Sequence, residues 1–219
     1  MKKIVVFVLI MTMALGCIAC GRGNEGDSSQ KPSQPESNIG QQESQKDETE
    51  SNEPETNKPV KPQIADAREI LIKAWARYPE SERFAVVGGH YSNYVDGAPA
   101  TYDISQKEDL EAVFCIPQED IEMIDDAASL QHGMNVNNFS AIAYHLVEGA
   151  DMQKLMDDIK TKTMNNQWLC GHPDRLIMIT IGDEYLVTAY GNGEVIENFK
   201  AKVLSLYDNA PKLVVDEEL

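Results

Sequence analysis

Histidine and cysteine are scarce in this chain of 219 residues, which contains four of each. The histidines show no HxH or HExxH spacing, and the sequence contains no Gly-x-Ser-x-Gly motif. These patterns are typical of zinc enzymes and of hydrolases with a serine nucleophile. We therefore predict no catalytic residues, no metal site and no cofactor, and we expect a protein that is not an enzyme.

Basic residues are also few, because 19 lysines and arginines stand against 36 aspartates and glutamates, which gives a net charge of −17. Residues 64–219 hold 12 of the basic and 27 of the acidic residues, a net charge of −15, so the acidity belongs to this part of the chain. Such a surface repels phosphate backbones. We expect no nucleic-acid partner. A solubilising surface explains the charge, although divalent cations or a basic partner would also fit it.

Long hydrophobic runs are absent, since the apolar stretch that follows Lys2 and Lys3 ends at Cys17. A membrane-spanning helix needs roughly 20 apolar residues, whereas a short run behind a basic start is typical of a signal peptide. The end of the run, Ala14-Leu15-Gly16-Cys17, resembles the lipobox of bacterial lipoproteins. The resemblance implies a lipoprotein signal peptide over residues 1–16 and acylation, as with palmitate, at Cys17. Cys20 is the alternative lipid attachment site, and an ordinary cleaved signal with incidental cysteines is the third interpretation.

Residues 17–63 contain the lipidation site and a polar linker. From Gly21 to Gln63 the chain is rich in Ser, Gln, Glu, Asn, Pro and Gly, and its aliphatic residues are Ile39 and Val60. Such a composition predicts disorder, because little apolar surface can be buried to offset the entropy of ordering. A flexible chain of this length spans on the order of 35–40 Å. We therefore expect a lipid-anchored protein on the extracytoplasmic face of the cell membrane, with its folded part held clear of the bilayer.

Residues 64–210 are predicted to form a single α+β domain, followed by a frayed acidic tail over residues 211–219. Apolar residues at three- and four-residue steps predict an N-terminal helix that ends at Pro79 and two later helices. Alternating or continuous apolar runs predict strands, and a unit of two strands and a helix occurs twice. We expect one antiparallel sheet with the helices packed on one face. The predicted segments are a helix over 64–78, a capping box and helix at Ser105–Glu108, strands over 121–128 and 140–147, a helix over 151–164, a hairpin over 176–190 and a helix over 194–207.

The order and spacing of these segments from Ile70 to Lys202 resemble those of a family of uncharacterised lipoproteins of Gram-positive bacteria, which share a domain of unknown function. The resemblance rests on the turn at Phe114–Pro117, on Glu148-Gly149 before a helix, and on Gly182-x-x-Tyr185 before the last predicted strand. It implies a lipid-tethered extracytoplasmic domain and supplies no activity and no functional residues. The chain departs from the pattern at Cys170-Gly-His172-Pro173, where we expect a tyrosine before the proline.

Cys115 and Cys170 are the two cysteines of the predicted domain. Outside the membrane they could form a disulfide, and the alternative is two buried free thiols. Asp125 and Asp126 with His132 would bind a metal only if the fold brought further ligands close. Cys170 and His172 have the residue types of a nucleophile and its base, but neighbours two apart in a loop rarely act so. His90 and His145 belong to no recognisable pattern.

The function that we expect is a non-catalytic interaction with another envelope protein or a cell-wall component. A small-solute-binding lipoprotein that serves a transporter is the alternative, and an envelope enzyme is a third hypothesis. A flat sheet face or an exposed apolar patch would favour the first. We expect the docking surface on the sheet face opposite the helices, where alternation could bring together Tyr144, Leu146, Tyr185 and Val187.

Overall fold

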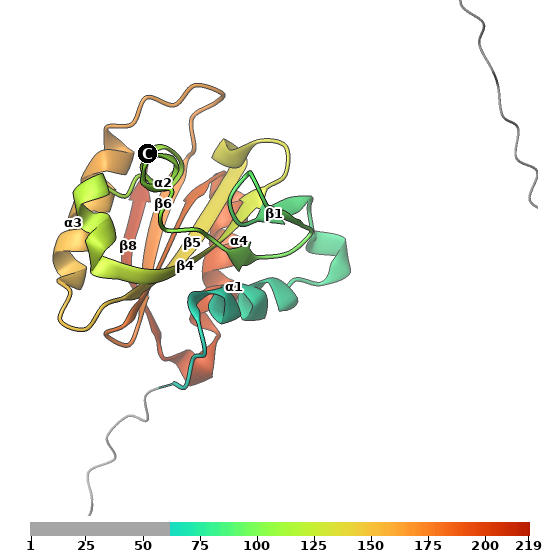
Figure 1. Ribbon diagram of the computed structural model, residues 1–219. Helices are drawn as coiled ribbons and strands as arrows, with labels where there is room; N and C mark the ends of the chain where they lie inside the picture. The colour runs from blue at the N-terminus through green and yellow to red at the C-terminus, as the bar shows by residue number, and fades with distance from the viewer. Residues whose placement is uncertain (1–61) are drawn as a thin grey trace, which may run out of the picture. The chain divides into compact units, whose positions relative to one another are not determined.

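The architecture of residues 62–219, the part that a computed structural model describes, is α+β with one eight-stranded antiparallel sheet (Figure 1). The helices are α1 (Ala67–Ala76), α2 (Lys107–Phe114), α3 (Met152–Met164) and α4 (Gly193–Leu204), and short 3-10 helices are η1 (Glu80–Glu82), η2 (Gln118–Met123), η3 (Val136–Asn138) and η4 (Tyr207–Asn209). The strands are β1 (Val86–Gly88), β2 (Val95–Asp96), β3 (Ala100–Thr101), β4 (Ile124–His132), β5 (Phe139–Leu146), β6 (Arg175–Ile181), β7 (Tyr185–Gly191) and β8 (Pro211–Glu218). The sheet order is β2-β1-β4-β5-β7-β6-β8, and β3 pairs with β4 outside this path.

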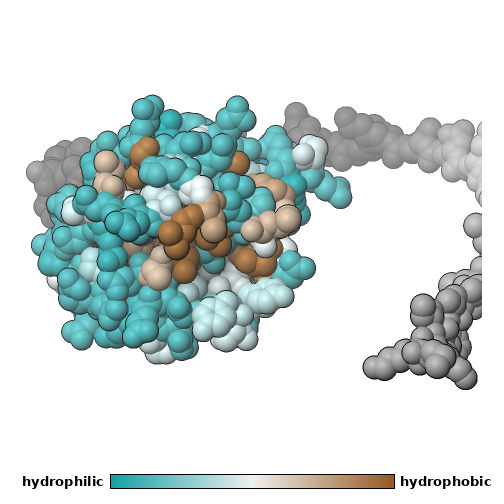
Figure 2. Space-filling model, turned by 90° about the horizontal axis from the view of Figure 1, so that it is seen from above, coloured by the Kyte–Doolittle hydropathy of each residue, from teal (hydrophilic) through white to brown (hydrophobic). Residues whose placement is uncertain are grey.

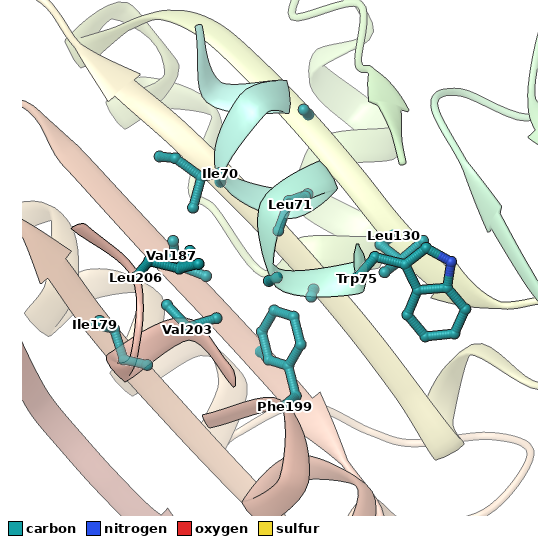
Figure 3. Close-up of a cluster of buried hydrophobic side chains, with 14 of the residues drawn as sticks. Ile70, Leu71, Trp75, Leu130, Ile179, Val187, Phe199, Val203 and Leu206 are labelled. Atoms are coloured by element: carbon teal, nitrogen blue, oxygen red, sulfur yellow. The ribbon is translucent and has the colours of Figure 1, made fainter. Parts of the chain in front are cut away.

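Helices cover both faces of this sheet, so the prediction that they pack on one face is wrong. α1 and α4 share one apolar cluster with alternate residues of the central strands, as Figure 3 shows for Ile70, Val187 and Phe199. α2 and α3 share a second cluster with the other set of alternate residues, which includes Tyr144 and Leu186. β7 is buried at every position, and a strand without apolar–polar alternation requires a covering layer on each side.

The sheet face on which we expected a docking surface does not exist as a shared surface. Tyr144 and Leu146 lie in the cluster of α2 and α3, whereas Tyr185 and Val187 lie in the cluster of α1 and α4. The reason is the register of β5 and β7, which places Tyr144 opposite Leu186. Residues that pair across neighbouring strands point to the same face of the sheet, so Tyr144 and Leu186 share one face, and Tyr185 and Val187 point to the other. All four side chains are buried.

The order strand-strand-helix occurs twice along the chain, as β4-β5-α3 and β6-β7-α4. The two helices pack on opposite faces of the sheet, α3 beside α2 and α4 beside α1. Asp151 is the N-cap of α3, as predicted, and its side chain accepts a hydrogen bond of 3.0 Å from the backbone N–H of Lys154. The predicted capping box at Ser105 is wrong, because Asp103 accepts the hydrogen bonds from Ser105 and α2 has no side-chain cap.

The C-terminal segment is not frayed, because it forms β8 and pairs with β6 from Arg175 to Ile181. Its acidic residues are neutralised by basic residues from other elements. Asp216 contacts Arg175 at 2.5 Å and Lys200 at 2.9 Å, and Glu217 contacts Lys160 at 2.5 Å. The sequence alone does not show these distant partners. The start of β4 was also predicted wrongly, since the strand begins at Ile124 and not at Ile121.

Candidate functional site

A groove with a volume of about 360 Å³ lies beside α1 and is closed on its other side by residues 95–99. Its apolar lining consists of Ile72, Trp75, Ala76, Val95, Ala98 and Pro99. Arg68 and Arg83 complete the lining, which contains no acidic residue. We call this feature the arginine groove.

The helix α1 supplies one wall of the arginine groove through residues beside its buried stripe. Asp66 caps the helix by accepting a hydrogen bond of 2.7 Å from the backbone N–H of Glu69. Ile70, Leu71 and Ala74 face the core, which leaves Arg68 and Ile72, one turn apart, toward the groove. Both side chains are exposed, and Ile72 keeps 40 % of its surface accessible.

The opposite wall depends on a glycine in β1. A Cβ atom on Gly88 would lie 2.3 Å from the backbone nitrogen of Ala100 and 2.4 Å from the carbonyl oxygen of Ala98. Only a residue without a side chain therefore allows the segment that contains Pro99 to approach the strand this closely. Val95, which pairs with Gly88, stays 46 % exposed at the edge of the groove.

The aromatic part of the groove is rigidly held. The Trp75 ring packs 4.8 Å from Tyr78 and edge-on at 5.4 Å from Phe84, measured between ring centroids. The guanidinium of Arg83 lies 5.7 Å from the centroid of Trp75, and its Nε donates a hydrogen bond of 3.2 Å to the carbonyl of Tyr78. Burial raises the pKa of the Tyr78 phenol above its usual value, so the phenol stays neutral beside the Arg83 cation.

Charge pairing is incomplete among the basic residues of the domain. Seven of the basic residues form ion pairs with carboxylates, namely Lys73, Lys154, Lys160, Lys162, Arg175, Lys200 and Lys202. Five basic residues form no such pair within residues 62–219, and two of them, Arg68 and Arg83, lie together in the lining of the groove. Two guanidinium groups beside an apolar floor therefore remain available to a ligand.

A second exposed apolar surface lies at the end of the sheet that faces the viewer in Figure 2, where brown side chains gather within a hydrophilic surround. The loops over 133–138 and 165–174 lie at this end (Figure 1). They carry Met134 and Leu169, which are 89 % and 84 % exposed. Asn135 and Asn137 join the two loops by donating hydrogen bonds to the carbonyls of Cys170 and Gly171.

The structure brings together one trio that sequence analysis missed. His90 is only 3 % exposed, and its Nε2 lies 2.7 Å from Asp109 while its Nδ1 lies 2.8 Å from the hydroxyl of Ser92. In a neutral imidazole, Nε2–H donates to the carboxylate and Nδ1 accepts from the hydroxyl. A chain of Ser, His and Asp is the arrangement of an activated nucleophile, here with the two ring nitrogens exchanged. Asp109 lies 19 residues from His90 in the sequence, on α2, so only the fold reveals it.

The other histidines and the acidic pair do not converge. His145 lies 2.5 Å from Asp125, and the neighbouring Asp126 accepts a hydrogen bond from the backbone of Ala67 at the start of α1. His132 lies at the far end of β4 and stacks on Phe84. Among residues 62–219 no group of three or more metal-binding side chains is found.

The cysteines of the domain are both free thiols, so the structure does not show the disulfide that the sequence allowed. Cys115 is buried and Cys170 is exposed, which also corrects the alternative of two buried thiols. Nδ1 of His172 hydrogen-bonds the carbonyl of Pro173, so this nitrogen is engaged with the backbone and not with the neighbouring thiol. Cys17 and Cys20, the signal peptide and the predicted linker lie outside the described residues.

No helix within residues 62–219 is both long enough and apolar enough to cross a bilayer. Comparisons of the chain with protein-family models, with curated proteins and with solved structures gave no match. The arginine groove is therefore the best candidate site on physical grounds alone. Local sequence carried no clear signal for it, since residues 66–83 hold four basic and four acidic residues and Arg68 and Arg83 lie 15 positions apart.

Proposed function

We propose that this protein is a lipid-anchored lipoprotein on the extracytoplasmic face of the membrane, whose domain binds another envelope protein or a cell-wall component without catalysing a reaction. The lipobox-like sequence before Cys17, the polar composition of residues 17–63 and the resemblance to uncharacterised lipoproteins of Gram-positive bacteria support the tether. Residues 17–63 then act as a spacer between lipid and domain.

The observation that carries the interaction function is the arginine groove. Protein interfaces are enriched in Trp, Tyr and Arg, and their strongest contacts cluster around side chains of these types. Trp75, Arg68 and Arg83 meet at the groove, and the partly exposed Ile72 and Val95 leave it open to solvent. An open apolar surface of this kind suits a macromolecular partner better than an enclosed solute.

The interaction is tested by placing a photo-crosslinking amino acid at Ile72 in cells that make the protein. A matched control carries it at Lys107, which is exposed on α2 across the sheet. We expect discrete crosslinked species from position 72 and not from position 107. The same species from both positions, or none from either, would contradict an interaction at the groove.

The anchor is tested separately by metabolic labelling with a fatty acid. We expect the unmodified chain to be labelled and the double variant Cys17→Ser/Cys20→Ser to be unlabelled and released from the membrane. Single variants then identify the acylated cysteine. An unlabelled wild-type chain, or label that persists in the double variant, would contradict the tether while leaving the groove experiment intact.

One observation favours a second candidate function, an envelope hydrolase. The trio of Ser92, His90 and Asp109 could activate the serine hydroxyl toward an acyl group. A fluorophosphonate probe would then label the wild-type chain and not the Ser92→Ala variant. Equal absence of label in both chains would exclude this candidate.

A further inference from the structure

The arginine groove carries two guanidinium groups on a domain in which acidic residues outnumber basic ones. Residues 64–219 hold 27 carboxylates and 12 basic residues, yet the lining of the groove contains two arginines and none of the carboxylates. Neither arginine forms an ion pair with a carboxylate of residues 62–219, and the guanidinium of Arg83 lies 5.7 Å from the centroid of the Trp75 ring. The groove is therefore a local positive site on a negative surface, which favours an anionic ligand there and repels one elsewhere.

The shape of the groove favours an extended chain over a small molecule. Ile72 and Val95 remain 40 % and 46 % exposed along its edges, so a ligand of a few atoms would stay largely in water. Trp75 is only 7 % exposed, so an extended peptide would place one side chain mainly against Ile72 and Val95 at the rim of the Trp75 ring and continue over both edges. Its flanking carboxylates could then reach Arg68 on one side and Arg83 on the other, because guanidinium groups pair with carboxylates in a bidentate geometry.

We infer that the arginine groove binds an extended segment of a partner protein in which an aromatic or aliphatic side chain is flanked by acidic residues. This inference rests on the proposed function, and it adds the chemistry of the partner. The apolar side chain would contact Trp75 and Ile72, and the carboxylates would contact the two arginines. Recognition would be sensitive to salt, since the charged contacts lie at the surface.

The experiment is a selection of random peptides of about ten residues, displayed on phage, against the full-length protein in detergent. A parallel selection uses the double variant Arg68→Glu/Arg83→Glu, and peptides that bind both are discarded. We expect the remaining peptides to carry acidic residues on each side of an aromatic or aliphatic residue. Peptides without acidic enrichment, or no peptides that depend on the two arginines, would overturn the inference.

Affinities of a selected peptide, labelled with fluorescein, provide the quantitative arm. We expect binding to the double variant to be about 10-fold weaker or more, because two charge-assisted contacts become repulsive. The matched control is the double variant Arg77→Glu/Lys107→Glu, which changes the net charge by the same amount; Arg77 donates to the carbonyl of Ser205 outside the groove, and Lys107 is exposed on α2. Binding to this control should stay within about 2-fold of wild type. An equal loss in both variants would overturn the inference, because it would show a general effect of net charge.

Other occupants give different results. Dimerisation of the wild-type chain that the double variant abolishes would assign the groove to a second copy. Tighter peptide binding after Asp47, Glu48 and Glu50 are neutralised would assign it to the chain's own acidic segment. Either result would overturn the assignment to a partner. Crosslinks at position 72 in cells, combined with selected peptides that are not acidic, would keep the interaction function and reject only the chemistry inferred here.

Discussion

Replacement of Asp216 by asparagine should lower the free energy of unfolding by about 1–2 kcal/mol at neutral pH, between the values for exposed pairs and for a broken buried pair. Asp216 accepts from Arg175 and Lys200, and its side chain is 23 % exposed while theirs are 29 % and 14 % exposed. Asparagine keeps the shape and removes the charge that faces both cations. For a domain of this size the loss corresponds to a fall in melting temperature of about 3–6 °C.

The pH dependence of the effect follows from the same contacts. The hydrogen bond from Arg175, assisted by Lys200, holds the pKa of Asp216 below its usual value. A carboxyl group whose pKa is lower in the folded state stabilises the protein above its unfolded pKa of roughly 3.9, and this contribution is lost as the pH falls through the folded pKa. The difference between wild type and Asp216→Asn should therefore be largest near neutrality and should shrink below about pH 4.

Urea denaturation followed by circular dichroism at several pH values measures this difference. Glu122→Gln is the control, because Glu122 is exposed in η2 and a surface change of this kind alters stability by less than about 0.5 kcal/mol. Glu69, Glu111 and Asp158 also have pKa values lowered by lysines, so both chains lose stability in acid and only their difference reports Asp216. A variant as stable as the control, or a difference that persists unchanged in strong acid, would refute the reasoning.

Two further predictions concern the core and the thiols. Phe199→Ala should destabilise the domain by about 3–5 kcal/mol in urea denaturation, because the side chain is fully buried between α4 and the sheet, and a loss below about 1 kcal/mol would contradict that packing. In a chain with Cys17 and Cys20 replaced by serine, Cys170 should react with a thiol reagent in the folded state, while Cys115 should react only after unfolding, because burial also raises the pKa of its thiol. A folded chain in which neither or both react would contradict these positions.

Local sequence patterns identified the elements of the central sheet because their signals are local. The hairpin around Gly182 and the N-cap at Asp151 were predictable, since a turn that needs positive φ and a cap that accepts from N3 involve few neighbouring residues. The sequence of β7 also indicated two covered faces, because Tyr185 to Gly191 contains no charged residue and lacks the apolar–polar alternation of a half-exposed strand. We predicted one covered face because the hairpin and helix pattern is typical of a sheet with helices on one side, and neither the strand parity nor the register of β5 and β7 was known.

The acidic C-terminus and the candidate site depend on contacts between distant residues, which no local pattern reveals. In the sequence, the three consecutive acidic residues at 216–218 resemble a solvated tail. In the fold, Asp216 lies in a strand that pairs with β6, and it forms ion pairs with Arg175 of β6 and Lys200 of α4. The arginine groove is lined by α1 and by residues 95–99, which are separated in the sequence by η1 and β1. Arg68 and Arg83 meet in a lining without acidic residues only in the folded chain, because the segment that contains them holds as many acidic as basic residues.

The outer edge of β8 is another surface of this domain that could recruit a peptide, by strand addition, because no described strand pairs with it. Three features guard that edge: Pro211 cannot donate a backbone hydrogen bond, Lys212 adds a charge, and the pairing with β6 is irregular at Val214. Natural sheets use such features to prevent edge pairing. The arginine groove has no comparable protection, since its apolar lining is open to solvent and its two arginines form no ion pair. A partner protein should therefore bind at the groove in preference to the edge of β8.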